Sequence, residues 1–316
     1  MNLRALRMFV ATADAGGLVP ACSKLHLSQP AASRQLQALE YELGVPLFHR
    51  GGRNLQLTAE GADLLRQSKQ LLKAADLLVD RARALKGGIT GTLRVAATPQ
   101  VIAGVLAGFL REHRCRHPGV EIQLVEGGAA QQPERIESGE VHLAIMPSGD
   151  QRFYGRLLYP VHGLAVVARS RLLGRGATLD VNELAEEPLL VLRREFGSRV
   201  WFDTACDIAR IRPVVRLESA APQTLVELAA ADYGIAVIPS TAAVRTKGVR
   251  FVPLVLNGDP LGRWSVVAWD RARLLPQYAR EFVDELVAYC EVANPGKAFT
   301  RSAPPLALPH PEPRQE

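Results

Sequence analysis

The N-terminal fold is decided by the stretch SQPAASRQLQALEYEL, residues 28–43. Ser28 is a good N-cap, and Pro30 lies in the first turn, where a missing N–H costs nothing, so the stretch predicts a helix that begins here. Apolar residues then recur at spacings of four, three and four. This predicts one stripe that faces a core, made of Ala32, Leu36, Leu39 and Leu43.

The opposite face of this helix has side chains that suit duplex DNA. Amides and a guanidinium can form hydrogen bonds with base edges, a hydroxyl can bind phosphate, and a proline ring can contact a thymine methyl group. We therefore predict that the helix enters a major groove and contacts DNA through Gln29, Pro30, Ser33, Arg34 and Gln37.

A short helix precedes this one. Residues 20–25 fit a helix with Pro20 at its first position, and His26 and Leu27 form a tight connection to the next helix. Two short helices joined in this way make a helix-turn-helix. An earlier amphipathic helix, ended by Gly16 and Gly17, is expected to pack on both through Leu3, Leu6, Phe9, Val10 and Ala13.

A small β-hairpin is predicted after the second helix of the pair. Residues 47–50 and 54–57 alternate around a turn of two glycines and one arginine. Such a wing can lie along the DNA backbone or reach into a minor groove. We expect Arg50 and Arg53 to hold it there.

The ordered residues of this module resemble the LysR-type transcriptional regulators. The matches are Leu6, Phe9, residues 25–33, Leu36, Leu39-Glu40, Leu43-Gly44, and residues 47–50 and 57–61. The resemblance implies a regulator that reads an interrupted palindrome upstream of a target gene as a dimer or tetramer, with RNA polymerase as a possible further partner. One departure is Val19, which stands where the family usually has a capping threonine and predicts a less firmly started helix.

Composition and charge set broad limits on the chain. It has 316 residues, and 38 Lys and Arg minus 32 Asp and Glu give a net charge of +6, which fits a polyanionic partner without requiring one. No apolar run approaches the length of a membrane span, and the N-terminus does not read as a signal peptide. The four cysteines, Cys22, Cys115, Cys206 and Cys290, form no CxxC pair, so we expect a reducing compartment, the bacterial cytoplasm, and no structural zinc.

One long helix is predicted between Thr58, a plausible N-cap, and the glycines that follow Lys86. Within it Leu64, Leu71, Leu78 and Leu85 recur at intervals of seven, which is typical of a coiled-coil seam. The alternative is a helix that packs on its own domain. We favour dimerisation because two copies read two DNA half-sites, and because this helix dimerises in the family.

Beyond a glycine-rich hinge the sequence alternates between strands and helices, which predicts an open α/β sheet in two halves. The first half has strands at 92–97, 120–125 and 141–146 and helices at 99–113 and 133–137. The second has strands at 164–168, 189–192, 214–217 and 235–238 and helices at 198–209 and 223–231, and the strand 264–269 and helix 276–290 return to the first half.

This part of the chain resembles the effector domain of the same family, whose fold is related to type 2 periplasmic binding proteins. The matching motifs are His117-Pro118, residues 143–145 and residues 229–239, in which Asp232 replaces the usual glycine. Because Asp tolerates a left-handed backbone, we expect that helix end to be kept.

The predicted fold is therefore multidomain: an N-terminal all-α winged helix-turn-helix with a long linker helix, followed by an α/β effector domain of two subdomains. The predicted boundaries are 1–58 for the DNA-binding domain, 59–90 for the linker and dimerisation helix, and 91–293 for the effector-binding domain. Its first half comprises 91–162 and 265–293 and its second half 163–264. A proline-rich tail, expected to be disordered, follows at 294–316.

A ligand of an open α/β sheet lies at the carboxyl ends of the strands. By that rule and by the loops that the family uses, we expect an effector to contact Thr98, Gln100, Gly127, Phe196, Ser198 and Ser219. Each of these residues could instead only cap a helix or close a turn. Arg193 and Arg194 favour an anionic effector, such as a carboxylate, unless they are solvated surface charges. No other cofactor is expected.

Other residues suggest chemistry less strongly. His113, Cys115 and His117 have the spacing of a metal cluster, but a solvated helix end is the favoured interpretation. Cys206 is interpreted as a buried small hydrophobic residue rather than a redox sensor. No catalytic or nucleotide-binding motif is present, so we expect no enzyme. Two alternatives to a ligand-responsive regulator stay open: an architectural DNA binder with a ligand-less second domain, and an enzyme or solute carrier built on the α/β part.

Overall fold

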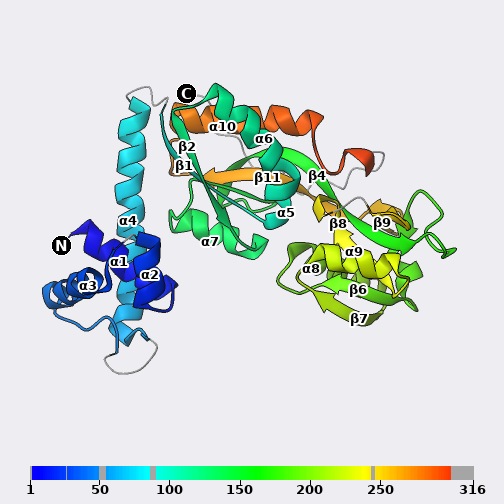
Figure 1. Ribbon diagram of the computed structural model, residues 1–316, viewed down its shortest axis with the longest axis horizontal. Coiled ribbons are helices and arrows are strands. Elements are labelled where there is room, and N and C mark those ends of the chain that lie inside the picture. The colour runs from blue at the N-terminus through cyan, green and yellow to red at the C-terminus, as the bar shows by residue number, and fades with distance from the viewer. Residues whose placement is uncertain (1, 26, 50–54, 86–89, 243–245, 300–316) are drawn as a thin grey trace. The chain divides into compact units, whose positions relative to one another are not determined.

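The computed structural model describes residues 2–25, 27–49, 55–85, 90–242 and 246–299. The chain divides into two compact units, Met1–Lys86 and Gly87–Glu316, each with its own core (Figure 1). No helix in the described part is long and apolar enough to cross a membrane.

The described residues of the N-terminal unit form four helices. Their apolar faces meet in one core whose fully buried members include Met8, Phe9 and Leu39. The ring of Phe9 packs edge-on against Phe48, with centroids 5.6 Å apart. The predicted stripe is confirmed, because Ala32, Leu36 and Leu39 are buried and Leu43 packs against them. The helices are α1 (Leu3–Asp14), α2 (Leu18–Leu25), α3 (Gln29–Leu43) and α4 (Ala59–Leu85).

One helix start and one N-cap differ from the prediction. The helix α2 begins at Leu18, so Pro20 is its third residue, still within the turn whose N–H groups have no partner inside the helix. The helix α3 begins after Ser28 as expected, but the Ser28 side chain makes no capping hydrogen bond. Pro30 in the first turn therefore favours this helix start more than the serine does. The helix ends at Gly44, which has a left-handed φ of 73°.

The base of the predicted hairpin is present. Phe48 pairs with Leu57, and His49 donates its backbone N–H to the carbonyl of Gln56 at 2.9 Å. The turn of the hairpin, including Arg50 and Arg53, lies outside the described residues.

The long helix α4 is confirmed, and the Thr58 hydroxyl caps it by accepting the Gly61 N–H at 2.8 Å. Its first half packs on its own unit, through Leu64 in the core and an ion pair of 2.9 Å between Lys69 and Asp14. Farther along, Leu78 is 71% exposed, whereas the side chain of Leu85 lies outside the described residues. The alternative of a self-packed helix thus holds around Leu64, and dimerisation through the residues farther along the helix stays a prediction.

The second unit contains one sheet in the order β2-β1-β3-β11-β4-β8-β6-β7, with β5, β9 and β10 beside it. The strands β2, β1 and β3 are parallel, as are β8, β6 and β7, which makes two α/β halves. The strands are β1 (Gly91–Ala97), β2 (Val120–Glu126), β3 (Leu143–Pro147), β4 (Phe153–Ala168), β5 (Leu179–Asp180), β6 (Pro188–Leu192), β7 (Val214–Ser219), β8 (Ile235–Pro239), β9 (Val249–Leu256), β10 (Asp259–Pro260) and β11 (Gly262–Asp270).

The strand β4 joins the two halves. It pairs antiparallel with β11 up to His162, and from Gly163 onward it pairs with β8, then also with β9. The sequence predicted only its last five residues, 164–168, because Pro160 and Gly163 interrupt a run that would otherwise read as a strand. The strand β9 was also missed.

The helices of this unit lie close to their predicted positions. The predicted helix 99–113 is present as the consecutive segments α5 (Pro99–Val101), the π-helix Ile102–Leu106 and α6 (Ala107–Arg116). Asp232 has the expected left-handed φ of 58°. The others are α7 (Gln132–Glu137), α8 (Gly197–Ala209), α9 (Pro222–Ala230) and α10 (Gln277–Val292).

The start of the tail is more ordered than predicted. Residues Lys297–Phe299 form one 3-10 turn, and the Asn294 side chain donates a hydrogen bond of 3.0 Å to the carbonyl of Cys290. Phe299 packs against the core of the second half, which explains why the prolines do not prevent structure here. The remainder of the tail, from residue 300, lies outside the described residues.

Candidate functional site

The helix α3 presents its polar face to solvent. Pro30, Arg34 and Gln37 are exposed there, with Gln29 exposed and Ser33 half-buried beside them. Tyr41, 91% exposed, continues the same spacing by one more turn. Tyr41 was not predicted from the sequence, although the spacing of four after Gln37 could have found it. The structure thus brings the five predicted α3 residues onto one helix, whereas it does not describe Arg50 and Arg53.

A glutamate on α3 fixes the strand that leads to the wing. Oε1 of Glu40 accepts the backbone N–H of Leu47 at 2.8 Å and that of Phe48 at 3.3 Å. Because both of these residues are buried, their N–H groups would otherwise lack a partner. Glu40 therefore fixes the position of the hairpin base relative to α3, the helix that carries the exposed polar face.

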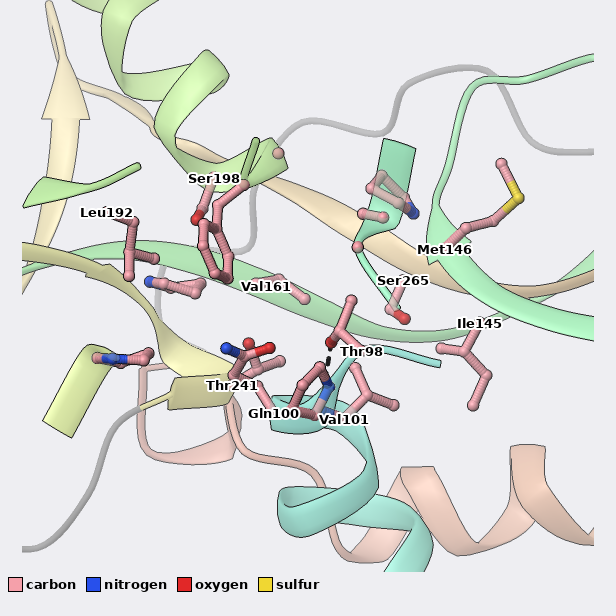
Figure 2. A pocket seen from close by; sticks show the side chains of 18 of the residues that line it. Thr98, Gln100, Val101, Ile145, Met146, Val161, Leu192, Ser198, Thr241 and Ser265 are labelled. Atoms are coloured by element: carbon pink, nitrogen blue, oxygen red, sulfur yellow. Dashed lines mark hydrogen bonds between the residues drawn. The ribbon is translucent and has the colours of Figure 1, made fainter. Parts of the chain in front are cut away.

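A cleft of about 550 Å³ lies between the two halves of the second unit. Figure 2 shows Thr98, Ser198 and Thr241 around it, each from a different element. Most of its wall is apolar. The last residues of the parallel strands and the loops and helix starts after them contribute part of the wall: Thr98, Pro99, Gln100, Glu126, Gly127, Gly128, Pro147, Glu195, Phe196, Gly197, Ser198, Ala220, Ala221, Pro222 and Thr241.

Five of the six predicted effector residues line this cleft, and Ser219 does not. The Ser219 hydroxyl instead accepts the backbone N–H of Ala221 at 3.0 Å, which closes the turn before α9. Thr98 lines the cleft and also caps a helix, because its hydroxyl accepts the Val101 N–H at 3.4 Å. Arg193 and Arg194 are exposed and are not lining residues.

Three helix N-termini point toward the cleft, those of α5, α8 and α9. Neither α8 nor α9 has a side-chain cap, so the N–H groups of Gly197 and Ser198 in α8 are available to a ligand, as is that of Gln223 in α9, whose first residue, Pro222, has none. Helix N-termini favour a negative charge. The carboxylates in the wall, Glu126 and Glu195, are both exposed and disfavour a second anionic group nearby.

Several lining residues were not predicted from the sequence. Met146 and Pro239 lie at the carboxyl ends of β3 and β8, so the rule of strand ends could have found them, whereas Ile145 is in the middle of β3. Trp201 is on α8. Val161 comes from β4, which joins the halves, and Trp264 and Ser265 come from β11, which pairs with β4; no local motif marks these three residues.

A buried arginine supports the second half of the cleft. Arg199 is 5% exposed, and its Nη1 donates to the carbonyl of Leu192 at 2.8 Å and to Glu218 at 2.7 Å, while its Nε donates to Asp203 at 2.7 Å. The hydrogen bond from Arg199 lowers the pKa of Glu218. The start of α8 and the ends of β6 and β7 are thereby tied together behind the lining residues.

Cys206 has the environment that its sequence context predicts. Its side chain is buried in the core of the second half. Burial raises the pKa of its thiol to about 12, so the reactive thiolate is scarce at neutral pH. The interpretation as a small hydrophobic residue is confirmed.

Comparisons with known proteins agree with this architecture. The family described as "Bacterial regulatory helix-turn-helix protein, lysR family" matches residues 3–62, and "LysR substrate binding domain" matches residues 86–291. The HTH-type transcriptional regulator IlvR of Caulobacter vibrioides is 34% identical over 283 residues, which cover 87% of this chain and 94% of that protein.

Two full-length solved structures are also similar. CbnR complexed with its target DNA is 26% identical, with a TM-score of 0.60 over 92% of this chain and 100% of that chain. A full-length OxyR variant from Pseudomonas aeruginosa has a TM-score of 0.68 over 93% of this chain and 99% of that chain, and at 21% identity this is a likeness of fold.

Proposed function

Because the chain belongs to the LysR family of bacterial transcriptional regulators, we propose that it binds promoter DNA through α3 and responds to a small molecule bound in the cleft. The exposed row of Pro30, Arg34 and Gln37 supports the first part, since it matches what a major groove can accept. The DNA-bound relative CbnR supports the same use of the N-terminal unit.

The functional unit is a homodimer, or a tetramer of two dimers. A single recognition helix reads only a few base pairs, whereas two copies read two half-sites of an interrupted palindrome. The exposed Leu71 and Leu78 on α4 supply an apolar surface for the second copy.

The effector is a small organic molecule with an apolar body and a single carboxylate. The single observation that carries this assignment is the cleft itself, in which an apolar wall surrounds uncapped helix N-termini. Its volume suits a small ligand. The cleft residues that we assign to contact it are Thr98, Gln100, Gly127, Phe196 and Ser198.

A ligand acts here by favouring one arrangement of the two halves over another. It can shift that equilibrium only by the ratio of its affinities for the two arrangements. Because β4 pairs with β11 in the first half and with β8 in the second, it connects the halves, and closure around a ligand moves one half relative to the other. In a dimer this changes the spacing of the DNA-binding units and so the bend of the DNA.

The test is thermal melting of the full-length protein with a panel of aromatic, aliphatic and amino acids. A ligand at a hundred times its dissociation constant adds about 2.7 kcal/mol of stability, a shift that melting resolves. A stabilising acid must also change the footprint on a bound promoter fragment. If no member stabilises the protein, the architectural DNA binder with a ligand-less second domain becomes the better description.

A further inference from the structure

The end of α6 and the middle of α10 bring together two imidazoles and a carboxylate, away from the cleft. These two helices lie side by side (Figure 1). Glu285 on α10 faces both His113 and His117: its Oε2 is 2.7 Å from Nδ1 of His113, and its Oε1 is 2.8 Å from Nε2 of His117. The two imidazole rings stack with centroids 4.4 Å apart. One carboxylate therefore bridges two histidines four residues apart.

This cluster is not the solvated helix end that the sequence suggested. His113 is 1% exposed, and its ring is stacked on Phe109 and meets Phe282 edge-on. Cys115 is exposed and its thiol donates to the carbonyl of Arg111 on its own helix. The third group of the cluster is thus Glu285 rather than Cys115.

We propose that His113 Nδ1, His117 Nε2 and one Glu285 oxygen bind a divalent transition-metal ion of the zinc class. Donor atoms from these three residues all lie within 4.8 Å of one another. Imidazole and carboxylate are donors that zinc and its neighbours Co²⁺, Ni²⁺ and Cu²⁺ accept, with a water in a fourth position. The side chains of His117 and Glu285 are 18% and 19% exposed, which leaves an entry path from solvent.

Modest movement converts the hydrogen-bonded cluster into a metal site. Zinc lies about 2.0 to 2.2 Å from such ligands, so tetrahedral ligand atoms are roughly 3.4 Å apart. The oxygen that binds the metal, now 2.7 Å from Nδ1 of His113 or 2.8 Å from Nε2 of His117, must therefore move away by about 0.6 to 0.7 Å, which rotation of the Glu285 side chain can supply. The metal then replaces the protons that the imidazoles now share with the carboxylate.

The surrounding charges fit a dication. Glu281 has an oxygen 3.6 Å from Nδ1 of His117, where it can orient that ring as the outer carboxylates of metal sites do. Arg116 lies 2.9 Å from Glu285, so the two glutamates and this arginine sum to one negative charge.

The second ring nitrogen of His113 limits the affinity of the cluster for a metal ion. Nε2 of His113 is buried with no hydrogen-bond partner in the described part of the chain. A metal on Nδ1 places the ring's remaining proton on this nitrogen, beside Phe109 and Phe282. The cost of burying that N–H without a good acceptor weakens binding relative to a site in which both histidines have partners.

The site is separate from the effector cleft. The helical segment from Pro99 to Arg116 has its first residues at the cleft and the histidine cluster at its other end. A metal ion here therefore ties α6 to α10 without occupying the effector's position. Metal binding at this cluster does not depend on the proposed function.

The experiment titrates Zn²⁺ into full-length protein that has been freed of metal with a chelator, and measures heat and melting temperature. Co²⁺ serves as a second probe, because its visible absorption reports nitrogen and oxygen ligation. We expect one ion per chain and a rise in melting temperature of about 5 °C at saturating Zn²⁺. His117→Ala and Glu285→Gln each weaken binding at least about tenfold.

Two matched controls sharpen the result. Cys115→Ser changes a possible zinc ligand two residues from each histidine, and Thr98→Val changes the cleft, so both variants must bind Zn²⁺ like the parent. Because His113 is buried, the test uses His117 and Glu285, and circular dichroism checks that each variant is folded. Absence of saturable binding at one ion per chain, unchanged affinity in both ligand variants, or loss of binding in Cys115→Ser would overturn the proposal.

Discussion

Glu40 on α3 accepts the backbone N–H of Leu47 at 2.8 Å, across the loop that separates the recognition helix from the hairpin. The same oxygen accepts the N–H of Phe48, a residue whose ring packs on Phe9 in the core. The side chain therefore determines where the hairpin starts relative to the helix that is proposed to read DNA.

Replacing Glu40 with Ala should destabilise the N-terminal unit by about 1 to 3 kcal/mol, because two buried N–H groups lose their acceptor. Chemical denaturation followed by far-ultraviolet circular dichroism measures this loss. Glu40→Gln keeps an acceptor oxygen and should recover a large part of the stability. Equal losses in the two variants would mean that the charge, rather than the hydrogen bonds, matters at this position.

Arg34 is exposed on the proposed DNA-binding face, and its replacement by Ala should weaken binding to the cognate site by about 1 to 3 kcal/mol. The loss on random duplex should be far smaller if the guanidinium contacts a base. Competition binding on both DNAs measures the difference. Arg66→Ala, which removes the same charge from an exposed position on α4, is the matched control. Equal losses on both DNAs would reduce Arg34 to a phosphate contact.

Leu78 is 71% exposed on α4, so we expect it to be covered by a second copy of the chain. Leu78→Asp should shift the assembly toward monomer at a given concentration, as sedimentation measures, because a charge is costly in a coiled-coil seam. Gln70→Asp adds the same charge to an exposed position outside the leucine repeat and should leave the assembly unchanged. A Leu78→Asp protein with the parent's molar mass would remove this residue from the dimer interface.

Thr98 and Ser219 make a matched pair for the effector cleft. Thr98→Val should reduce the affinity for the stabilising acid about tenfold, since a polar group at the α5 N-terminus is lost. Ser219→Ala should bind like the parent, because the Ser219 hydroxyl closes a turn and is not a lining group. Isothermal titration calorimetry with the acid identified in the melting panel measures the affinity of each variant. A larger loss in Ser219→Ala than in Thr98→Val would contradict the assignment.

Two of the buried histidines, His113 and His162, should make the second unit sensitive to acid. Burial lowers both folded pKa values below the ordinary 6.5. The unfolded chain therefore binds more protons, so the stabilising contribution is complete above pH 6.5 and is lost as the pH falls through the lowered folded values.

The free energy of unfolding should fall by up to about 1.4 kcal/mol per pH unit for each of these histidines. Urea denaturation between pH 7.5 and roughly pH 5, in the presence of a chelator, measures that slope. His162→Phe should reduce the dependence of the free energy of unfolding on pH by up to about 1.4 kcal/mol per pH unit, which is the contribution of one proton. An unchanged slope would show that His162 is protonated alike in the folded and unfolded chain.

The sequence predicted the local parts of the fold well. The stripe of Ala32, Leu36 and Leu39 and the left-handed Asp232 follow from contacts within a few residues, which spacing and backbone preference describe. Cleft positions such as Thr98 and Ser198 follow from the rule that ligands lie at strand ends.

The parts that the sequence did not predict depend on contacts between distant segments. Val161 and Trp264 reach the cleft from β4 and β11, whose pairing joins distant segments of the chain, so no local motif marks them. Most of β4 was missed because Pro160 and Gly163 interrupt it, although pairing with β11 and β8 still makes it a strand. The burial of His113 depends on α10, whose Glu285 is 172 residues away in sequence.

The most direct test of the central claim is in vitro selection of random duplex DNA by the purified full-length protein, followed by footprinting of the enriched sequence. We expect enrichment of an interrupted palindrome whose two half-sites are both protected, and loss of that enrichment in Arg34→Ala. Enrichment of no sequence over the starting pool, or a single protected half-site bound by a monomer, would contradict it.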